Sequence, residues 1–516
     1  MSKNRIPALT VAAAFALMAA PAFSQAPRPT GETAAAPAPN GPLVKTRQGE
    51  LRGTVADGVA VYKGLPFAAP PVGDLRWRAP RPAAKWSGVR TATAFSSTCA
   101  QAEDCLYLNL YVPADAKANS KLPVMVWIHG GAFVFGSGSA YDGTHFAQQG
   151  VIVVTVNYRL GRAGWFAHPA LTAEDSKGKS ILGNYGLMDQ IAALEWVRDN
   201  IKAFGGDTKN VTIFGESAGA ISVNYLMLAK QAQGLYVRAL AESGFGRIDA
   251  KPISAVAESN VAWAEKAGVK GTDAAAAKAL RAIPWSEMVA ANPSIGASNQ
   301  ILPMNDGKLI TETVAIGFQK GDEARVPYLL GGNSDEASLT RRGFNAPQTL
   351  AAIQYNRLAL LAAYDPDNSG DADRIMARVI TDRTISEPDR DLARLHTQHG
   401  SATYVYHFSY TAAAQRSTLI GLPHGGEITY VFNTPRGSGF DAEGKAISLA
   451  ANKYWAQFGK NGDPDSAGGV QWPKFDLQNE ALLEFPASGV PVAQMHFHKA
   501  RLDWTEGSLA AAAAPK

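Results

Sequence analysis

The most constraining stretch of this chain is Gly215-Glu216-Ser217-Ala218-Gly219, a Gly-x-Ser-x-Gly turn between a predicted strand and a predicted helix. The preceding run, residues 211–214, is apolar and β-branched like a buried strand, and residues 220–226 are typical of a helix. Glycines on both sides of the turn let the backbone bend sharply and present the serine hydroxyl at a helix N-terminus, where negative charge is favoured. The alternative is a glycine-rich turn with a solvated serine, so the turn alone does not establish a nucleophile.

Strands and helices are predicted to alternate around this turn. Residues 106–112 alternate in polarity like a strand, and residues 123–128 and 151–156 are near-continuous apolar runs, as in central strands covered on both faces. Apolar residues then recur at helical spacing from Leu187 to Phe204. We therefore expect an α/β fold with a mostly parallel sheet. Further strands are expected at 326–330 and 404–408, a hairpin at 44–53, and helical cap or side regions at 250–300 and 340–400.

The N-terminus has the pattern of a secretory signal. Lys3 and Arg5 precede an apolar stretch from Ala8 to Ala20 that is too short for a permanent membrane anchor. We expect cleavage after Ser24; an N-terminal core helix is the alternative. No later stretch is long and apolar enough to span a membrane, so the sequence predicts a secreted or periplasmic protein without a stable membrane anchor.

The remaining domain limits follow from composition. Residues 25–42 are rich in proline and alanine and are predicted to be a linker. One domain is expected over 43–508, since α/β catalytic domains often reach this length. The Ala-rich segment 509–516 is expected to be a loose tail.

Charge and cysteine usage narrow the partners. The 516 residues carry a net charge of only +4, with no basic run interleaved with aromatic residues, so nucleic acid is not an expected partner. No histidine pair has convincing metal-ligand spacing, and we expect no metal and no cofactor. The two cysteines, Cys99 and Cys105, are expected to form a disulfide in an oxidising compartment. Two free buried thiols are the alternative if the signal interpretation is wrong.

A nucleophilic serine needs a base and an acid behind it, and for this kind of turn the expected chain order is serine, acid, histidine. His424 lies among small residues in the segment 421–427, which would let its ring reach the serine. His496 and His498 alternate on an apparent strand, which we interpret as one face of a sheet. The acid is expected after the strand at 326–330, where Asp335 and Glu336 compete; strand periodicity points them in opposite directions without choosing between them.

An oxyanion that develops on an attacked carbonyl needs amide donors. Gly131 and Ala132 follow the predicted strand 123–128 and carry little bulk, and the amide of Ala218 comes just after Ser217. These three amides would form a donor pocket, with a plain Gly-Gly turn as the alternative.

Four motifs of the chain belong together. They are Phe214-Gly215-Glu216-Ser217-Ala218-Gly219-Ala220, Glu103-Asp104-Cys105-Leu106-Tyr107-Leu108-Asn109, Phe204-Gly205-Gly206-Asp207 and His424-Gly425-Gly426-Glu427-Ile428. With them the chain resembles the type-B carboxylesterase family, the branch of the α/β-hydrolase fold that includes carboxylesterases and cholinesterases, over nearly all of residues 43–505. The resemblance implies that the acid is Glu336, that Ser217 is the nucleophile and His424 the base, and that Ser243 is a second serine near the acid. It places the oxyanion donors on Gly131, Ala132 and Ala218.

The resemblance implies a serine hydrolase that cleaves carboxylic esters through an acyl-enzyme, with a small-molecule ester as substrate. A lipase acting on long-chain acylglycerols is the alternative, and a binding protein on the same fold is a third possibility that the intact set of site residues disfavours. Only residues 100–104 separate the two cysteines, and none is aromatic, which argues against a choline-binding enzyme and predicts an open mouth for bulky esters. Phe133, Trp165 and Phe166 are candidates to line the pocket, with core packing as the alternative.

Overall fold

The computed structural model describes residues 41–174, 182–290, 301–341, 344–434 and 441–513. The expected signal at 1–24, and the linker up to residue 40, lie outside this part of the chain. The first strand, β1, starts at Leu43, so regular structure begins where the linker was expected to end. None of the helices in the described ranges is long and apolar enough to cross a membrane.

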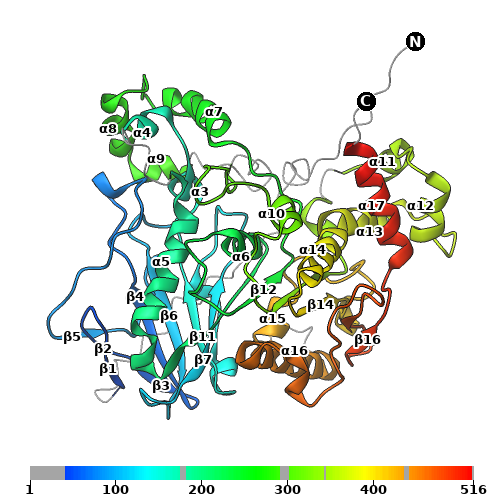
Figure 1. The fold of residues 1–516 in the computed structure, drawn as a ribbon, viewed down its shortest axis with the longest axis horizontal. Coiled ribbons are helices and arrows are strands. Elements are labelled where there is room, and N and C mark those ends of the chain that lie inside the picture. The colour runs from blue at the N-terminus through cyan, green and yellow to red at the C-terminus, as the bar shows by residue number, and fades with distance from the viewer. Residues whose placement is uncertain (1–40, 175–181, 291–300, 342–343, 435–440, 514–516) are drawn as a thin grey trace.

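A large mixed sheet runs through the molecule, with helices on both faces (Figure 1). Its eleven strands have the order β16-β15-β14-β13-β12-β11-β7-β8-β6-β4-β3. The seven strands from β15 to β8 pair in parallel, and the strands beyond them at either edge pair antiparallel. The predicted α/β architecture is therefore confirmed. A smaller sheet holds the expected hairpin in the order β1-β2-β5.

Apart from the strand expected at His496 and His498, the predicted strands occur, with ends shifted by a few residues. The strand bounds are β1 (Leu43–Lys45), β2 (Glu50–Arg52), β3 (Thr54–Ala56), β4 (Val59–Pro66), β5 (Val89–Thr91), β6 (Tyr107–Pro113), β7 (Leu122–Ile128), β8 (Ile152–Val156), β9 (Trp165–Phe166), β10 (Gly183–Asn184), β11 (Gly206–Glu216), β12 (Arg238–Glu242), β13 (Tyr328–Asn333), β14 (Thr403–Phe408), β15 (Leu482–Phe485) and β16 (Val492–Gln494).

The helices fill the connections between strands and the two side regions. Their bounds are α2 (Thr144–Ala147), α3 (Gly161–Gly164), α4 (Pro169–Glu174), α5 (Tyr185–Asn200), α6 (Ala218–Leu228), α7 (Ile253–Lys266), α8 (Ala274–Ala282), α9 (Trp285–Ala290), α10 (Val314–Lys320), α11 (Ala346–Ala352), α12 (Arg357–Tyr364), α13 (Ala372–Thr381), α14 (Glu387–Gln398), α15 (Ile428–Val431), α16 (Ala442–Asn461) and α17 (Lys499–Ala513).

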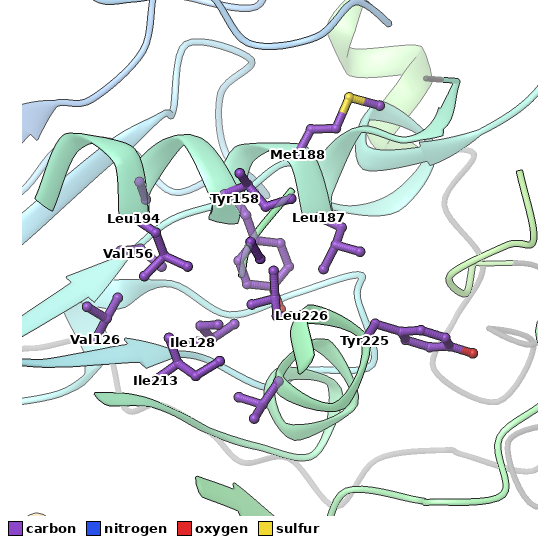
Figure 2. Close-up of a cluster of buried hydrophobic side chains, with 14 of the residues drawn as sticks. Val126, Ile128, Val156, Tyr158, Leu187, Met188, Leu194, Ile213, Tyr225 and Leu226 are labelled. Carbon is purple, nitrogen blue, oxygen red and sulfur yellow. The ribbon is translucent and has the colours of Figure 1, made fainter. Parts of the chain in front are cut away.

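The central strands are apolar on both sides because both faces of the sheet are covered. In β7, Val126 and Ile128 belong to one buried cluster while Met125 and Trp127 belong to another, as the two-residue period of a strand requires. Figure 2 shows the first cluster, in which α5 and α6 pack their apolar side chains onto β7, β8 and β11. Helix α16 covers the opposite face, where Trp455 joins the second cluster.

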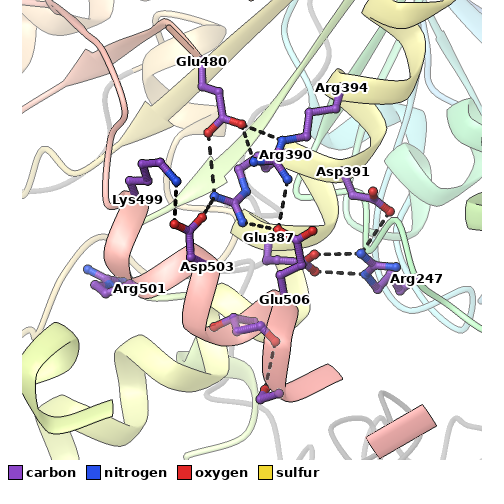
Figure 3. Close-up of polar contacts among 12 residues, drawn as sticks. Arg247, Glu387, Arg390, Asp391, Arg394, Glu480, Lys499, Arg501, Asp503 and Glu506 are labelled. Atoms are coloured by element: carbon purple, nitrogen blue, oxygen red, sulfur yellow. Dashed lines mark hydrogen bonds and ion pairs between the residues drawn. The ribbon is translucent and has the colours of Figure 1, made fainter. Parts of the chain in front are cut away.

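The C-terminal side of the molecule is held in a different way. Helix α17 lies against α14, and charged side chains join the two helices (Figure 3). Arg390 on α14 donates hydrogen bonds to Asp503 and Glu506 on α17, each over 2.8 Å. The segment 509–516 was expected to be loose, but α17 continues through Ala513 and makes most of it helical.

The expected strand position of His496 and His498 is wrong. Strand β16 ends at Gln494, and both histidines lie in the turn before α17 with backbone φ angles of 52° and 53°. A residue with positive φ cannot continue an extended strand, so the alternating pattern reflects a turn rather than one face of a sheet.

Candidate active site

The Gly-x-Ser-x-Gly turn forms a sharp bend between β11 and α6. Ser217 has φ 56° and ψ −121°, a conformation that non-glycine residues rarely adopt. Its N–H donates to the carbonyl of Glu242 on the neighbouring strand over 2.8 Å, and its carbonyl accepts from Ile221 N–H over 2.9 Å. The strained serine is thus held by β12 on one side and by the first turn of α6 on the other.

The two glycines of the turn allow close approach to β7. A Cβ atom added to Gly219 would lie 1.9 Å from the carbonyl oxygen of Ile128, and one added to Gly215 would lie 2.6 Å from the same oxygen. Real Cβ atoms essentially never come so close to a backbone oxygen, so only glycine lets α6 begin directly against the end of β7. Ser217 therefore comes to lie beside the Gly130-Gly131 turn that follows β7.

The three expected donor amides belong to a turn after β7 and to the first residue of α6. Within the described chain, the N–H groups of Gly131 and Ala132 donate no hydrogen bond, and both residues have positive φ, 108° and 50°. Ala218 is the first residue of α6, where a backbone N–H has no carbonyl one turn back to bond to. His129 and Tyr158 brace this turn, because their rings stack at 4.4 Å and the Tyr158 hydroxyl donates to the His129 carbonyl over 2.7 Å.

The structure brings His424 and Glu336 into direct contact. His424 Nδ1 makes a short hydrogen bond with Glu336 Oε2, and both side chains are buried. The other carboxylate oxygen, Oε1, accepts from the Ser243 hydroxyl over 2.6 Å and from Asn333 N–H over 2.7 Å. Asp335 points the other way and pairs with Arg341. Of the two competing carboxylates, Glu336 is therefore the one beside the imidazole, and Ser243 lies next to it as the resemblance implied.

Two loops carry these residues, and they are bound to each other. The acid loop, residues 333–338, follows β13, and the base loop, residues 421–424, follows β14 along the chain. Asp335 N–H donates to the Leu422 carbonyl over 3.0 Å, forming an isolated bridge between the loops. Side chains of the acid loop add three more contacts with the base loop. These are Ser334 Oγ with Leu422 N–H at 2.9 Å, Asn333 Nδ2 with the Pro423 carbonyl at 3.0 Å and Ser338 Oγ with His424 N–H at 3.0 Å.

The imidazole also lies against the Gly-x-Ser-x-Gly turn. His424 Nε2 is 3.1 Å from Oε1 of Glu216, the residue before Ser217, although the two atoms are not aligned as a hydrogen bond. Nε2 has no hydrogen-bond partner in the described part of the chain, Ser217 included. Hydrogen bonds between a catalytic base and its nucleophile are often long until substrate is present. The geometry thus leaves Nε2 available beside the turn.

Buried carboxylates surround His424 and change its acidity. Burial lowers the pKa of His424, but the charges of Glu216, Glu336 and Glu427 outweigh burial and raise it to about 9. Burial also raises the pKa of Glu216 to about 7 and that of Glu427 to about 8, and it raises the pKa of Glu242 well above its usual range. Burial therefore opposes ionisation of these carboxyl groups, whereas their proximity favours the charged form of the imidazole.

Sequence reasoning did not find these additional residues of the site. Glu216, Glu242 and Glu427 are each nearly inaccessible, whereas glutamate is normally a surface residue. Glu216 could have been noticed because it occupies the variable position directly before the serine in the turn. Ser338 could have been noticed as the second residue after Glu336 in the motif used to choose the acid.

The other expected site features have mixed outcomes. Cys99 and Cys105 form a disulfide. Phe133, Trp165 and Phe166 are fully buried, and Phe133 packs edge-on against Trp165 at 4.6 Å, so core packing accounts for them. In the described ranges, no group of three or more His, Cys, Asp or Glu residues is arranged to hold a metal ion.

Comparisons with known proteins agree on one family. The model of the carboxylesterase family matches residues 40–502. Carboxylesterase 1E of Mus musculus is 34% identical over 90% of this chain and 93% of its own length. Fumonisin B1 esterase of Sphingopyxis macrogoltabida is 32% identical over 85% of each chain. Among solved structures, the Geobacillus stearothermophilus carboxylesterase EST55 matches with a TM-score of 0.78 at 33% identity, over 90% of this chain and 99% of the other.

The described geometry and these relatives lead to the same conclusion. A strained serine lies on a strand–turn–helix bend, and a histidine–glutamate pair lies against the same bend, where His424 Nε2 is 3.1 Å from Glu216 Oε1. The family model extends across the whole sheet and both loops that carry these residues. The chain therefore belongs to the carboxylesterase family, and it is a hydrolase of carboxylic esters.

Proposed function

We propose that Ser217 is the nucleophile of this esterase. Its hydroxyl attacks the ester carbonyl, and the carbonyl oxygen becomes an oxyanion that accepts hydrogen bonds from the amides of Gly131, Ala132 and Ala218. The positions of these amides, described above, support this assignment. The strained backbone of Ser217 costs roughly 1–3 kcal/mol and holds the hydroxyl where α6 contributes its N-terminal dipole.

His424 acts first as base and then as acid. Nε2 takes the proton from the Ser217 hydroxyl during attack and gives it to the leaving alcohol, which leaves an acyl-enzyme. In the second half-reaction Nε2 removes a proton from water, the resulting hydroxide attacks the acyl carbon, and the proton returns to Ser217 as the acid departs. Glu336 fixes the ring through Nδ1 and stabilises its charged form.

The observation that carries this proposal is the buried contact between His424 Nδ1 and Glu336, with Nε2 directed at the turn that holds Ser217. Ser217→Ala should reduce kcat on a p-nitrophenyl ester by about 10⁶-fold, the loss measured when a serine protease loses its nucleophile. It should also abolish labelling by a fluorophosphonate. The control is Ser259→Ala, because Ser259 is exposed on α7 and contacts only a local carbonyl. An undiminished rate in Ser217→Ala would overturn the assignment.

We further propose that the substrates are soluble small-molecule esters, including esters with bulky groups, rather than emulsified lipids. The loop between Cys99 and Cys105 is short, and one of the relatives is named for the hydrolysis of fumonisin B1. The test compares soluble esters of increasing acyl and alcohol size with emulsified long-chain triglyceride. A sharp rise of activity on the emulsion would favour the lipase alternative instead.

The protein is proposed to act after export, with residues 1–24 removed and 25–42 serving as a linker. N-terminal sequencing of the mature protein from the medium or periplasm tests this. A mature chain that begins near Gln25 supports the proposal, and an intact Met1 in an unexported protein contradicts it.

A further inference from the structure

A cavity of about 300 Å³ adjoins the acid loop and the base loop. None of Ser217, Glu336 and His424 lines it, although its wall includes Ser334 from the acid loop and Gly421 from the base loop. Three arginines, two histidines and one glutamate dominate the rest of the wall. They are Arg378, Arg416, Arg501, His407, His498 and Glu484.

Two of the three arginines are already neutralised. Arg501 donates to both carboxylate oxygens of Asp382, over 2.8 and 2.9 Å. Arg416 pairs with Glu443 over 2.8 Å. Arg378 differs from both, because in the described residues its only hydrogen bond is to the Tyr364 carbonyl over 3.1 Å and no carboxylate lies within ion-pair distance.

The two histidines are neutral, and their imidazole nitrogens form no hydrogen bond to another described residue. Burial, together with the charge of Arg501, lowers the pKa of both His407 and His498 to about 3. Their rings meet edge-on with centroids 5.8 Å apart. Neither imidazole forms a hydrogen bond to another described residue, so each can offer an N–H to a molecule in the cavity.

Glu484 limits the charge that the cavity accepts. Its carboxylate accepts hydrogen bonds from the Ser409 hydroxyl over 2.6 Å and from Gln494 Nε2 over 2.9 Å. These two bonds hold the negative charge of Glu484 at the wall of the cavity. Arg378, which has no ion pair with any described residue, favours an anion, whereas Glu484 opposes a second negative charge in the same space. A volume of about 300 Å³ is at the lower end of the range for small-molecule sites.

We propose that this cavity binds a small organic monocarboxylate, with the carboxylate on Arg378 and on an imidazole N–H of His407 or His498. Ester hydrolysis releases molecules of this chemical class, so the enzyme itself supplies a ligand. Ser334 lies in the cavity wall and also accepts a hydrogen bond from Leu422 N–H in the base loop. An occupied cavity is therefore in contact with the loop that positions His424.

The test is calorimetric titration of the full-length enzyme with benzoate, and with neutral benzamide as the matched ligand control. The enzyme is first treated with diethyl p-nitrophenyl phosphate to block the esterase site, and the mass increase is recorded. We expect benzoate to bind the blocked enzyme and benzamide not to bind. Absence of the mass increase would contradict the proposed Ser217 chemistry, and benzoate binding would still report separately on the cavity.

Variants assign the bound benzoate to the cavity. Arg378→Gln should weaken binding by roughly tenfold or more, since it removes a charged hydrogen-bond donor. Arg198→Gln makes the same change at an exposed arginine on α5 and should leave binding unchanged. His498→Phe keeps the ring but removes its N–H, and should also weaken binding. No benzoate heat in the wild type, or equal affinity in Arg378→Gln and wild type, would overturn the proposal.

Discussion

The two halves of this site are held in place by opposite means. The serine turn between β11 and α6 is fixed by backbone hydrogen bonds, by glycines that permit close approach, and by apolar packing beneath α5 and α6 (Figure 2). The histidine and glutamate lie on loops that are joined mainly by polar contacts. Behind them, α14 and α17 are linked by charged side chains (Figure 3).

This difference shows how an esterase can combine rigidity with adjustment. The backbone of the serine turn is packed directly against the end of β7, so neither segment can move aside. The position of Ser217 is therefore set within narrow limits. Hydrogen-bonded side chains can re-form their contacts after small shifts of a loop. The comparison predicts that the serine region tolerates almost no change in shape, whereas the C-terminal region tolerates shape changes but responds to changes in charge.

The largest effect is expected for Gly219→Ala. The new methyl group would lie 1.9 Å from the Ile128 carbonyl oxygen, and neither backbone can move without separating α6 from β7. We expect a loss of about 3 kcal/mol or more in the free energy of unfolding, measured by urea denaturation.

Gly507→Ala is the matched control in the C-terminal region. This glycine is also helical, but the nearest atom to its added Cβ is the Tyr355 hydroxyl, at the free end of a side chain that can rotate. The free energy of unfolding of this variant should equal that of the wild type or exceed it by up to about 1 kcal/mol, because alanine is the better helix former. Equal losses at both glycines would contradict the comparison.

A smaller effect is expected for Arg390→Gln, which removes the centre of the network between α14 and α17. Arg390 is buried, but its partners Asp503 and Glu506 are 44% and 49% exposed, so solvent screens the interaction. We expect a loss of about 1–2 kcal/mol at low salt. The difference in melting temperature from the wild type should shrink in 1 M salt, and a salt-independent difference would show that packing rather than charge holds α17.

Ser338→Ala tests the contact between the acid loop and the base loop. The substitution leaves the His424 backbone N–H without its acceptor, 3.0 Å away in the wild type. A lost hydrogen bond of about 1 kcal/mol corresponds to roughly a fivefold lower kcat/KM if the imidazole shifts. The melting temperature should change little. A normal kcat/KM with a lowered melting temperature would mean that Ser338 supports the fold and not the base.

The subtlest effect concerns the pH profile of Glu216→Gln. His424 must be neutral to act as base, and its raised pKa means that activity in the wild type is lost as the pH falls through that value. Among the charges that raise the pKa of His424, that of Glu216 has the largest effect. Its removal should lower the pKa, so the acidic limb of kcat/KM should move to lower pH. A shift to higher pH would contradict the assigned electrostatics.

Much of this organisation was predictable from the residues. The apolar runs at 123–128 and 151–156 became the central strands β7 and β8, because a doubly covered strand can hide no polar face. The serine turn was predicted because its glycines and its strand–helix context are local features. Strand alternation left Asp335 and Glu336 as alternatives and the family resemblance implied Glu336, which is the carboxylate that the structure places on the imidazole.

The parts that sequence reasoning missed depend on contacts between distant segments. Glu242 and Glu427 are buried because the C-terminal end of the interior strand β12 and the segment after the base loop lie close together, and nothing in their local sequence distinguishes them from surface acids. His496 and His498 were misplaced because a turn with positive φ angles can show the same alternation as a strand. In both cases the local pattern was compatible with two structures, and tertiary packing decided.

The binding of the acid loop to the base loop has a consequence for biosynthesis. Ser217, α6 and the strand β12 that holds the turn have all been made by residue 242, whereas Glu336 and His424 come later in the chain. A nascent or truncated chain that stops before residue 424 therefore carries the proposed nucleophile, Ser217, without the proposed base. With these proposed roles, ester hydrolysis can begin only after His424 has been synthesised, late in the translation of the 516 residues.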